Sequence, residues 1–188
     1  PRTIAYSLER LRARLPDASV IVVDDSADEY IADLSKFEVS HLLLDFDSGL
    51  SRGRNIGISH VQSEFFLLHD DDQFPAGDFD LASVVDTLQT LPVIDAAGGR
   101  EDDTPPVFDS FEMTDERILV QYRETAWSSV GKGADAVKLF HMVQNQTLWR
   151  TQNFRRKKLS WTPELKVGEH VDFFYRYRGL INVIYSPA

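Results

Sequence analysis

Apolar residues follow two different spacings along this chain. Short continuous runs such as Val20–Val23 are typical of strands that are covered on both faces. Elsewhere apolar residues recur every three or four positions, as in an amphipathic helix. Helices are expected over residues 3–14, 27–35, 51–60, 78–91 and 169–178. Strands are expected over residues 20–23, 41–46, 65–68, 107–113, 117–122, 136–142 and 180–185.

The order of these elements predicts the fold class. As far as residue 91 strands alternate with helices, which implies right-handed crossovers and a largely parallel, doubly wound sheet. After Val93 the pattern changes, and apolar residues alternate with polar ones in two runs that Thr114–Glu116 separates. This alternation predicts an antiparallel hairpin. We therefore expect one mixed α/β domain over residues 1–188, with halves 1–98 and 99–188 that join near Gly98-Gly99.

Composition and charge narrow the class of protein. The chain has 188 residues, of which 43% are hydrophobic and 27% charged, as in an ordinary globular domain. Its formal net charge of −10 argues against nucleic acid as a partner and fits an anionic membrane surface poorly. No apolar run is long enough to predict a membrane span. The absence of cysteine excludes disulfides and thiolate chemistry, and it favours a reducing compartment. Because the chain begins at Pro1, we expect a piece of a longer protein, truncated at both ends.

Three consecutive carboxylates follow the apolar run Phe65–Leu68. Asp70, Asp71 and Asp72 repel one another unless a cation compensates their charge. Open α/β sheets bind their ligands at the carboxyl ends of the strands, where this cluster should lie. Hard oxygen ligands suit Mn²⁺ or Mg²⁺, which in turn can bind a diphosphate. The alternative is a solvated acidic loop.

Asp24 and Asp25 follow another predicted strand. A carboxylate at this position can accept hydrogen bonds from a ribose hydroxyl or a base N–H. The alternative is that Asp25 or Ser26 caps the next helix.

The segment Gly49–Gly57 is a second candidate contact for a phosphate or nucleotide. Ser51 is expected to be the N-cap of a helix, and the glycines permit close approach of the backbone. Arg52 and Arg54 place cations near the helix N-terminus, where the dipole also favours anions. An ordinary capped helix with exposed arginines is the alternative.

The segment Trp161–Phe174 gathers acids, a histidine and aromatic residues. A carboxylate at a helix start that points into a cleft could remove the proton from an attacking hydroxyl, which makes Glu169 a candidate base. The alternative is that Glu169 and Asp172 only favour the N-terminus of their own helix.

Together, in this order, these segments resemble the family 2-like glycosyltransferases of the GT-A fold. The matching residues are V-V-D-D-S with a further D, then S-R-G-R-N-x-G, L-H-D-D-D and W-x-x-x-L-x-x-G-E-H-x-D-F-F-x-R. The E-H-x-D-F-F ending is most similar to the β-1,4-N-acetylgalactosaminyltransferase branch. The resemblance implies a mostly parallel mixed sheet flanked by helices, with a nucleotide-binding first half and an acceptor and catalytic second half.

The resemblance also implies a role for each matched residue. On the donor side these are Asp24 and Asp25 at the uracil or ribose, Arg54 and Asn55 in the nucleotide cleft, Asp71 near the donor ribose, and Asp70 and Asp72 at the metal. On the acceptor side they are Glu169 as the base or orienting group, Asp172 as the alternative base, Trp161 as an aromatic platform for the acceptor sugar, and His170 beside it.

The implied activity is an inverting, Mn²⁺- or Mg²⁺-assisted transfer of a hexose or N-acetylhexosamine from a UDP-sugar to a glycan or other hydroxyl acceptor. The implied location is the bacterial cytoplasm, or the Golgi lumen if the parent is a eukaryotic type II membrane protein. One alternative is a non-catalytic sugar- or nucleotide-binding domain. Another is a nucleotidyltransferase that uses the three aspartates, although no G-x-x-x-x-G-K-[S/T] loop is present.

Overall fold

The contacts of the chain divide it into two compact units. The first unit comprises the residues as far as Gln62 together with Ser160–Phe173, and the second comprises Ser63–Leu159 and the residues from Phe174 onward. The computed structural model describes residues 4–71, 80–99, 107–114, 119–131, 136–143 and 146–186. The division into a nucleotide half and an acceptor half is a functional one and stays a prediction.

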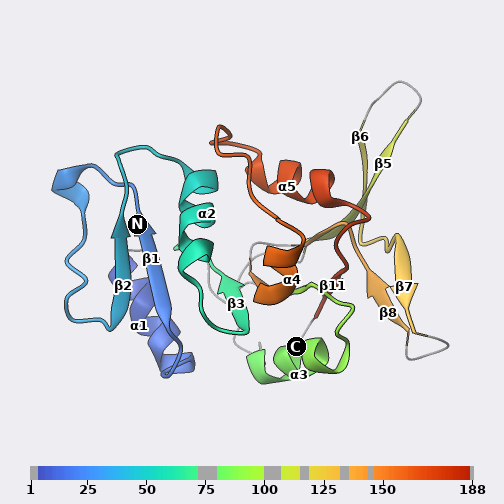
Figure 1. Ribbon diagram of the computed structural model, residues 1–188, viewed down its shortest axis with the longest axis horizontal. Coiled ribbons are helices and arrows are strands. Elements are labelled where there is room, and N and C mark those ends of the chain that lie inside the picture. Colours follow the sequence, from blue (N-terminus) through green and yellow to red (C-terminus); the bar gives the residue numbers. More distant parts are fainter. Residues whose placement is uncertain are drawn as a thin grey trace. The chain divides into compact units, whose positions relative to one another are not determined.

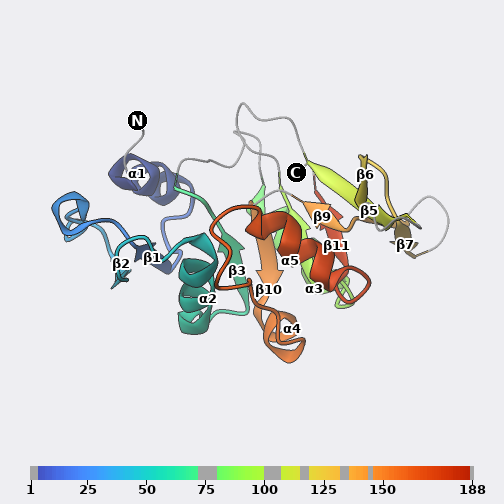
Figure 2. The ribbon, with the colours of Figure 1, turned by 90° about the horizontal axis from the view of Figure 1, so that it is seen from above.

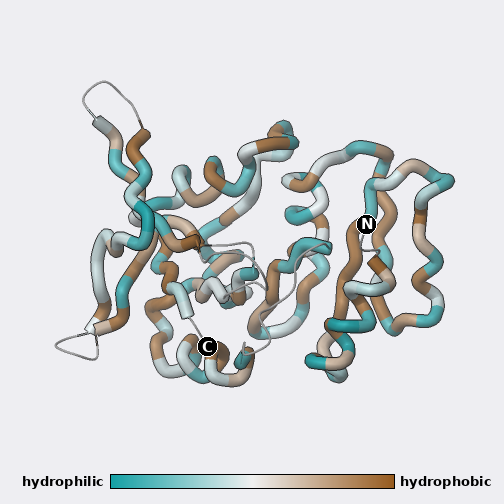
Figure 3. Tube along the Cα trace, turned by 180° about the vertical axis from the view of Figure 1, so that it is seen from behind, coloured by the Kyte–Doolittle hydropathy of each residue, from teal (hydrophilic) through white to brown (hydrophobic). Residues whose placement is uncertain are grey.

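The first unit is built on a pair of parallel strands. The register of β1 and β2 runs from Val20↔Val39 to Asp24↔Leu43 (Figure 1). The apolar residues of β1 form one of the hydrophobic stretches in Figure 3. The elements in chain order are α1 (Ile4–Arg14), β1 (Val20–Asp24), the 3-10 helix η1 (Asp28–Tyr30), β2 (Val39–Leu43) and α2 (Leu50–His60).

Both helices of this segment are tied to the strand pair. The Arg12 guanidinium on α1 donates hydrogen bonds to the carbonyls of Ala18 and Glu38, which precede β1 and β2. Helix α2 lies against β1, and a Cβ added at Gly57 would be 3.1 Å from a methyl of Val23. Gly57 therefore serves close packing of a helix on a strand.

The helix expected over residues 27–35 is wrong. Only Asp28–Tyr30 forms a 3-10 turn, and the chain then runs as a loop to β2. The Asp33 carboxylate accepts a hydrogen bond from the backbone N–H of Ser35 at 2.9 Å. This local side-chain bond competes with helical hydrogen bonding, as aspartate commonly does outside helix caps.

Two boundaries next to the predicted site also differ from expectation. Strand β2 begins at Val39 and ends at Leu43, because Asp45–Ser48 forms a turn with Asp47 at a φ of 58°. The N-cap of α2 is Gly49, so Ser51 is not the cap as expected and instead lies buried in the first turn.

The second unit contains a four-stranded mixed sheet in the order β11-β4-β10-β3. Strand β10 runs antiparallel to both β3 and β4, while β11 is parallel to β4. Apolar residues of helix α3 pack on this sheet and form its core with Ile94, Leu139 and Ile184 (Figure 2). The elements concerned are β3 (Phe65–Leu68), α3 (Leu81–Thr90), β4 (Ala96–Gly98), β10 (Thr147–Arg150) and β11 (Val183–Tyr185).

The expected hairpin after residue 107 is confirmed. Strands β5 and β6 pair antiparallel from Asp109↔Arg123 to Met113↔Leu119. The run expected as one strand over residues 136–142 is interrupted, because β8 pairs with β7 while β9 pairs with β5. These elements are β5 (Phe108–Met113), β6 (Leu119–Arg123), β7 (Ser128–Val130), β8 (Val137–Leu139), β9 (Met142–Val143), α4 (Thr151–Arg156) and α5 (Glu169–Tyr177).

Strands β4, β7 and β10 and helix α4 were not predicted from the sequence. Gly98 was expected at a join between halves, but it lies buried in β4, where an added Cβ would be 2.5 Å from the Cβ of Val143. Alanine and glycine have low strand propensity, so β4 gives no local signal and depends on its neighbours in the sheet. Mixed strand directions of this kind are common where helices flank a large sheet.

Candidate active site

Asp24 and Asp25 lie at the carboxyl end of β1, as expected. The Asp24 carboxylate accepts hydrogen bonds from the Ser26 backbone N–H at 2.9 Å and from Nε2 of His41 at 3.1 Å. Burial alone would raise the pKa of Asp24, but the hydrogen bonds from Ser26 and His41 outweigh it and hold this pKa below its usual value. The Asp24 carboxylate is therefore held as an acceptor.

Asp25 contacts the start of α2. Its Oδ2 accepts a hydrogen bond from the backbone N–H of Gly49 at 2.7 Å. The Gly49 φ of 88° is readily available only to glycine, so this turn brings the positive end of the α2 dipole to the carboxylate. Asp25 thus stabilises α2 at its N-terminus, while the cap expected at Ser51 is absent.

Arg54 and Glu169 form a buried ion pair within the first unit. Arg54 Nη1 donates to Glu169 Oε1 at 2.8 Å, and the two side chains are only 6% and 9% exposed. Glu169 lies in the first turn of α5, where the helix dipole also favours a carboxylate. Two residues predicted for opposite sides of the reaction, the nucleotide cleft and the base, are therefore direct partners.

Asn55 connects α2 to the segment that precedes α5. Its side-chain amide donates to the Trp161 carbonyl at 2.9 Å, and its Oδ1 accepts from the Trp161 N–H at 2.9 Å. The next residue, Thr162, donates from Oγ1 to Asp172 Oδ2 at 2.8 Å. Asn55 on α2 and Asp172 on α5 thus both bind the start of this loop.

Trp161 lies in the core and not on a surface. Its side chain is 1% exposed, and its ring stacks on Phe173 with centroids 4.1 Å apart. The Arg54 guanidinium is 5.7 Å from the centroid of the Trp161 ring. An acceptor sugar has no exposed indole face here, so the expected platform at Trp161 is not present in this structure. His170 is half-buried in the first turn of α5, and its acceptor role stays a prediction.

The acidic cluster follows β3 in the second unit. His69 Nδ1 accepts a hydrogen bond from Nε2 of Gln146 at 2.6 Å, in line with the register that pairs Thr147 with Leu68. Asp70 is half-buried and Asp71 is exposed, while Asp72 lies outside the described residues. Within the described ranges no group of three or more His, Asp or Glu side chains is arranged to hold a metal, so the Asp70–Asp72 metal pair stays a prediction.

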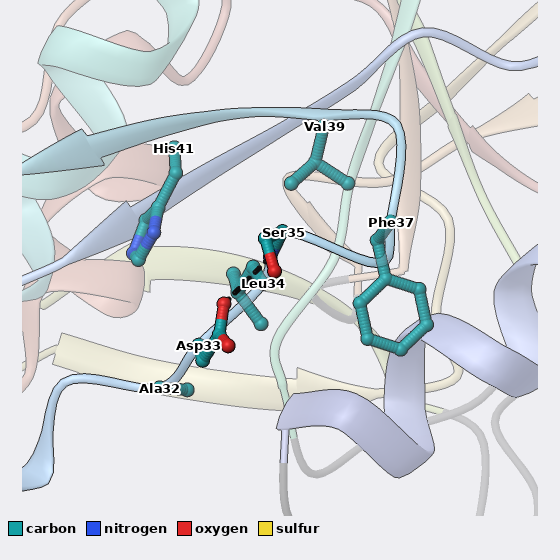
Figure 4. Close-up of a pocket in the computed structure, with 7 residues that line it drawn as sticks. All are labelled: Ala32, Asp33, Leu34, Ser35, Phe37, Val39 and His41. Carbon is teal, nitrogen blue, oxygen red and sulfur yellow. Dashed lines mark hydrogen bonds between the residues drawn. The ribbon is translucent and has the colours of Figure 1, made fainter.

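His41 and Gln146, which were not singled out from the sequence, contact residues of the candidate site. His41 lines an open pocket of about 400 Å³ beside β2, and its imidazole points toward this space (Figure 4). The strand spacing of β2 was the available signal, because it places His41 on the half-buried face. The pocket is lined by Ala32, Asp33, Leu34, Ser35, Phe37, Val39 and His41.

Residues 1–176 match the sequence model of the family described as glycosyl transferase family 2. The chain belongs to glycosyl transferase family 2.

Among curated relatives of this family 2 chain is mouse beta-1,4 N-acetylgalactosaminyltransferase 2, which is 26% identical over all 188 residues of the chain. The chain covers 36% of that protein's length. Mouse beta-1,4 N-acetylgalactosaminyltransferase 1 is 32% identical over 99 residues, which are 52% of this chain and 17% of that protein. The chain thus covers much less than two thirds of the length of either relative.

Solved structures support the same GT-A fold for this family 2 chain. TarS residues 1–349 from S. aureus, crystallised in complex with UDP, align with a TM-score of 0.57 at 18% identity, covering 90% of this chain and 51% of that one. GalNAc-T7 with UDP, GalNAc and Mn²⁺ aligns with a TM-score of 0.61 at 13% identity, covering 97% and 39%. The α/β fold class expected from the sequence is confirmed. None of the described helices is long and apolar enough to cross a membrane.

Proposed function

We propose that this chain carries the donor site and the base of a UDP-sugar-dependent glycosyltransferase. The transferred group would be a hexose or N-acetylhexosamine, and the acceptor a hydroxyl of a glycan. The printed names of two relatives are those of N-acetylgalactosaminyltransferases, and the solved TarS structures include complexes with UDP and UDP-GlcNAc. This agreement supports a nucleotide-sugar donor for the chain.

The observation that carries the proposal is the buried contact between Arg54 and Glu169. A carboxylate with one oxygen fixed at 2.8 Å from a guanidinium has little rotational freedom. We assign the second oxygen, Oε2, to the acceptor hydroxyl. General-base catalysis by a carboxylate oriented in advance would contribute roughly 10²- to 10⁴-fold to the rate.

The reaction then proceeds by a single displacement. Glu169 takes the proton of the acceptor hydroxyl as its oxygen forms a bond to C1 of the donor sugar. The bond between C1 and the UDP oxygen breaks on the opposite face, UDP leaves with the electron pair, and the configuration at C1 is inverted. Asp172, which accepts a hydrogen bond from Thr162, is the alternative base.

The donor side requires compensation of the diphosphate charge. Asp24 and Asp25 would accept hydrogen bonds from the uracil or ribose, and Asp71 would contact the ribose. Asp70 and Asp72 would hold Mn²⁺ or Mg²⁺, which when bound neutralises charge that develops on the leaving UDP. The carboxylate donor set suits these hard cations.

The deciding experiment compares Glu169→Gln with Glu164→Gln. Each variant removes one carboxylate, but Glu164 is exposed in the loop before α5. With a panel of UDP-sugars and glycan acceptors, we expect Glu169→Gln to release UDP at least about 100-fold more slowly than the unchanged chain. Its affinity for UDP should stay the same, and Glu164→Gln should match the unchanged chain.

Thermal unfolding separates catalysis from stability in this experiment. Glu169→Gln leaves the buried Arg54 charge without its anionic partner, which is expected to destabilise the fold. Rates are therefore compared below the unfolding transition of each variant. An unchanged rate in Glu169→Gln would mean that Glu169 is not the base and would leave Asp172 as the candidate. If the unchanged chain releases no UDP with any of the donors, the proposed activity is refuted.

A further inference from the structure

Three aromatic rings form a parallel stack in the second unit. The ring of Trp127 lies on that of His141 with centroids 5.0 Å apart and an angle of 11° between the planes. The ring of His141 is also parallel to that of Phe111, with centroids 6.1 Å apart and again an angle of 11°. Phe111 is buried at 6% exposure, whereas Trp127 is 39% exposed and ends the stack. His141 lies against the indole ring, and Trp127 is nevertheless partly open to solvent.

Hydrogen bonds fix the middle ring of this stack. His141 Nδ1 accepts a hydrogen bond from the Phe111 backbone N–H at 2.9 Å. The backbone N–H of His141 donates to the Asp109 carbonyl at 2.8 Å. The backbone of Trp127 itself donates to the Leu139 carbonyl at 3.0 Å. The indole is therefore held in one orientation before any ligand arrives, which lowers the entropic cost of binding.

The far end of the stack rests on α5. The ring of Tyr175 packs against Phe111 at 6.3 Å with an angle of 64°, and the Arg178 guanidinium lies 3.9 Å from the Tyr175 centroid. Tyr175 belongs to the helix that begins at Glu169. The stack thus continues from a surface indole to the part of α5 that belongs to the second unit.

The surroundings of Trp127 are polar. Ser129, two residues further along, pairs with Lys138 in the register of β7 and β8, so the two side chains lie on the same face of this hairpin. Both residues are exposed. Figure 1 shows β7 and β8 beside β5 and β6, and Phe111 belongs to β5. The hairpin that follows Trp127 thus carries a hydroxyl and an ammonium group that can form hydrogen bonds beside a stacked ring.

We propose that Trp127, held by His141, is a stacking surface for a pyranose ring of the saccharide acceptor. Sugars have few apolar surfaces, and these are flat patches of C–H bonds that fit the face of an aromatic ring. Their hydroxyl groups around the ring edge need polar partners such as Ser129 and Lys138. This assignment rests on the proposed function, and it supplies the exposed aromatic surface that buried Trp161 does not.

Tryptophan fluorescence gives a direct test. Trp149 and Trp161 are each 1% exposed, so acrylamide should quench mainly Trp127. The probe is methyl β-galactoside, whose C3–H, C4–H and C5–H bonds share one face. The control compound is glycerol, which has hydroxyl groups but no such face. We expect methyl β-galactoside to protect Trp127 from acrylamide, and glycerol at the same concentration not to do so.

Variants make the assignment specific. By saturation-transfer NMR, Trp127→Ala should bind methyl β-galactoside at least about fivefold more weakly, and Trp127→Phe should retain part of the affinity. Tyr122→Ala removes another exposed aromatic residue of the same unit and should bind normally. Circular dichroism establishes that each variant is folded, and Trp127→Phe keeps the test valid if Trp127→Ala does not fold.

The possible outcomes separate the two proposals. Unchanged affinity in folded Trp127→Phe and Trp127→Ala, or equal protection by glycerol, would overturn the stacking surface while leaving the transferase proposal intact. A raised acceptor KM with unchanged UDP affinity in Trp127→Ala would support both. Protection of Trp127 by methyl β-galactoside in a chain that neither binds UDP nor transfers sugar would support the stacking surface and refute the proposed activity.

Discussion

Arg54 and Glu169 illustrate what single residues can and cannot reveal before the fold is known. Both residues were singled out from the sequence because each lies near the N-terminus of a predicted helix. Their 2.8 Å contact joins positions 115 residues apart, and no local pattern encodes such a pair. Trp161 shows the reverse, since an aromatic residue beside acids suggested an exposed surface. Its burial depends on Phe173 and on the bonds to Asn55, which only the folded loop brings together.

The buried pair of Arg54 and Glu169 also contributes to the stability of the fold. Removal of one partner of a buried ion pair costs about 3–5 kcal/mol, because the remaining charge is left without compensation. An exposed pair such as Lys36–Glu9, with side chains 62% and 60% exposed, contributes roughly 1 kcal/mol or less. Loss of activity in variants of Arg54 or Glu169 is therefore informative only when their stability is measured as well.

At the same scale, His141 should make stability depend on pH. Burial lowers the pKa of His141 below its usual 6.5, and the charge of Arg178 lowers it further. On β5, the Asp109 carboxylate is engaged by Gln121. A depressed histidine pKa means that the unfolded chain binds a proton more readily than the folded one. The contribution of His141 is thus complete above pH 6.5 and decreases as the pH falls below that value.

Urea unfolding at pH 7.5 and pH 5.5 measures this effect. The substitution His141→Gln keeps an acceptor for the Phe111 N–H but removes the titrating group. We expect the unchanged chain to lose more of its free energy of unfolding between the two pH values than His141→Gln does. Parallel pH profiles for the two proteins would show that folding does not shift the pKa of His141.

At the scale of elements, the strength of local signals decided which predictions succeeded. Strand β3 was predicted with its observed bounds, because Phe65–Leu68 is a continuous apolar run between polar residues. Helices α1, α2 and α5 were predicted to within one or two residues from their spacing. Strand β4 contains only Ala96, Ala97 and Gly98, and it forms because β10 and β11 pair with it on either side. Such a strand is specified by its neighbours and not by its own residues.

Gly98→Ala should therefore destabilise the second unit strongly. The added Cβ would lie 2.5 Å from the Cβ and 2.8 Å from a methyl of Val143, and the Val143 Cβ cannot move without the backbone. Overpacking of this kind costs about 1–3 kcal/mol. Gly53→Ala on α2 is the matched control, because its Cβ would make ordinary contact at 3.7 Å.

Equilibrium unfolding in urea distinguishes the two glycine variants. In a helix, replacing glycine by alanine stabilises by roughly 0.5–1 kcal/mol, so Gly53→Ala should raise the midpoint while Gly98→Ala lowers it. Equal midpoints would mean that β4 and β9 are not packed as closely as described.

For the whole molecule, charge is the property that the sequence determines most directly. The formal net charge of −10 opposes the approach of an anionic UDP-sugar unless cations compensate locally. Arg54 is already occupied by Glu169, and Lys166 by the Asp47 carboxylate at 2.6 Å. A divalent cation held by the acidic residues after β3 would reconcile an acidic chain with an anionic donor.

Asp72→Ala tests whether a metal site at Asp72, and not the net negative charge alone, controls the affinity for UDP. Asp72→Ala and Asp86→Ala each remove one negative charge, so both change the net charge from −10 to −10 + 1 = −9. Asp86 is exposed on α3 and has no proposed role in binding.

Calorimetry measures the affinity of each protein for UDP with and without Mn²⁺. If Asp72 ligates the metal, Mn²⁺ should increase this affinity in the unchanged chain and in Asp86→Ala, but not in Asp72→Ala. Chelation with EDTA should bring all three proteins to the same weak affinity. A response to Mn²⁺ in Asp72→Ala as large as in Asp86→Ala would contradict the metal role of Asp72. Because the two substitutions alter the total charge equally, any difference between them belongs to the position of the carboxylate.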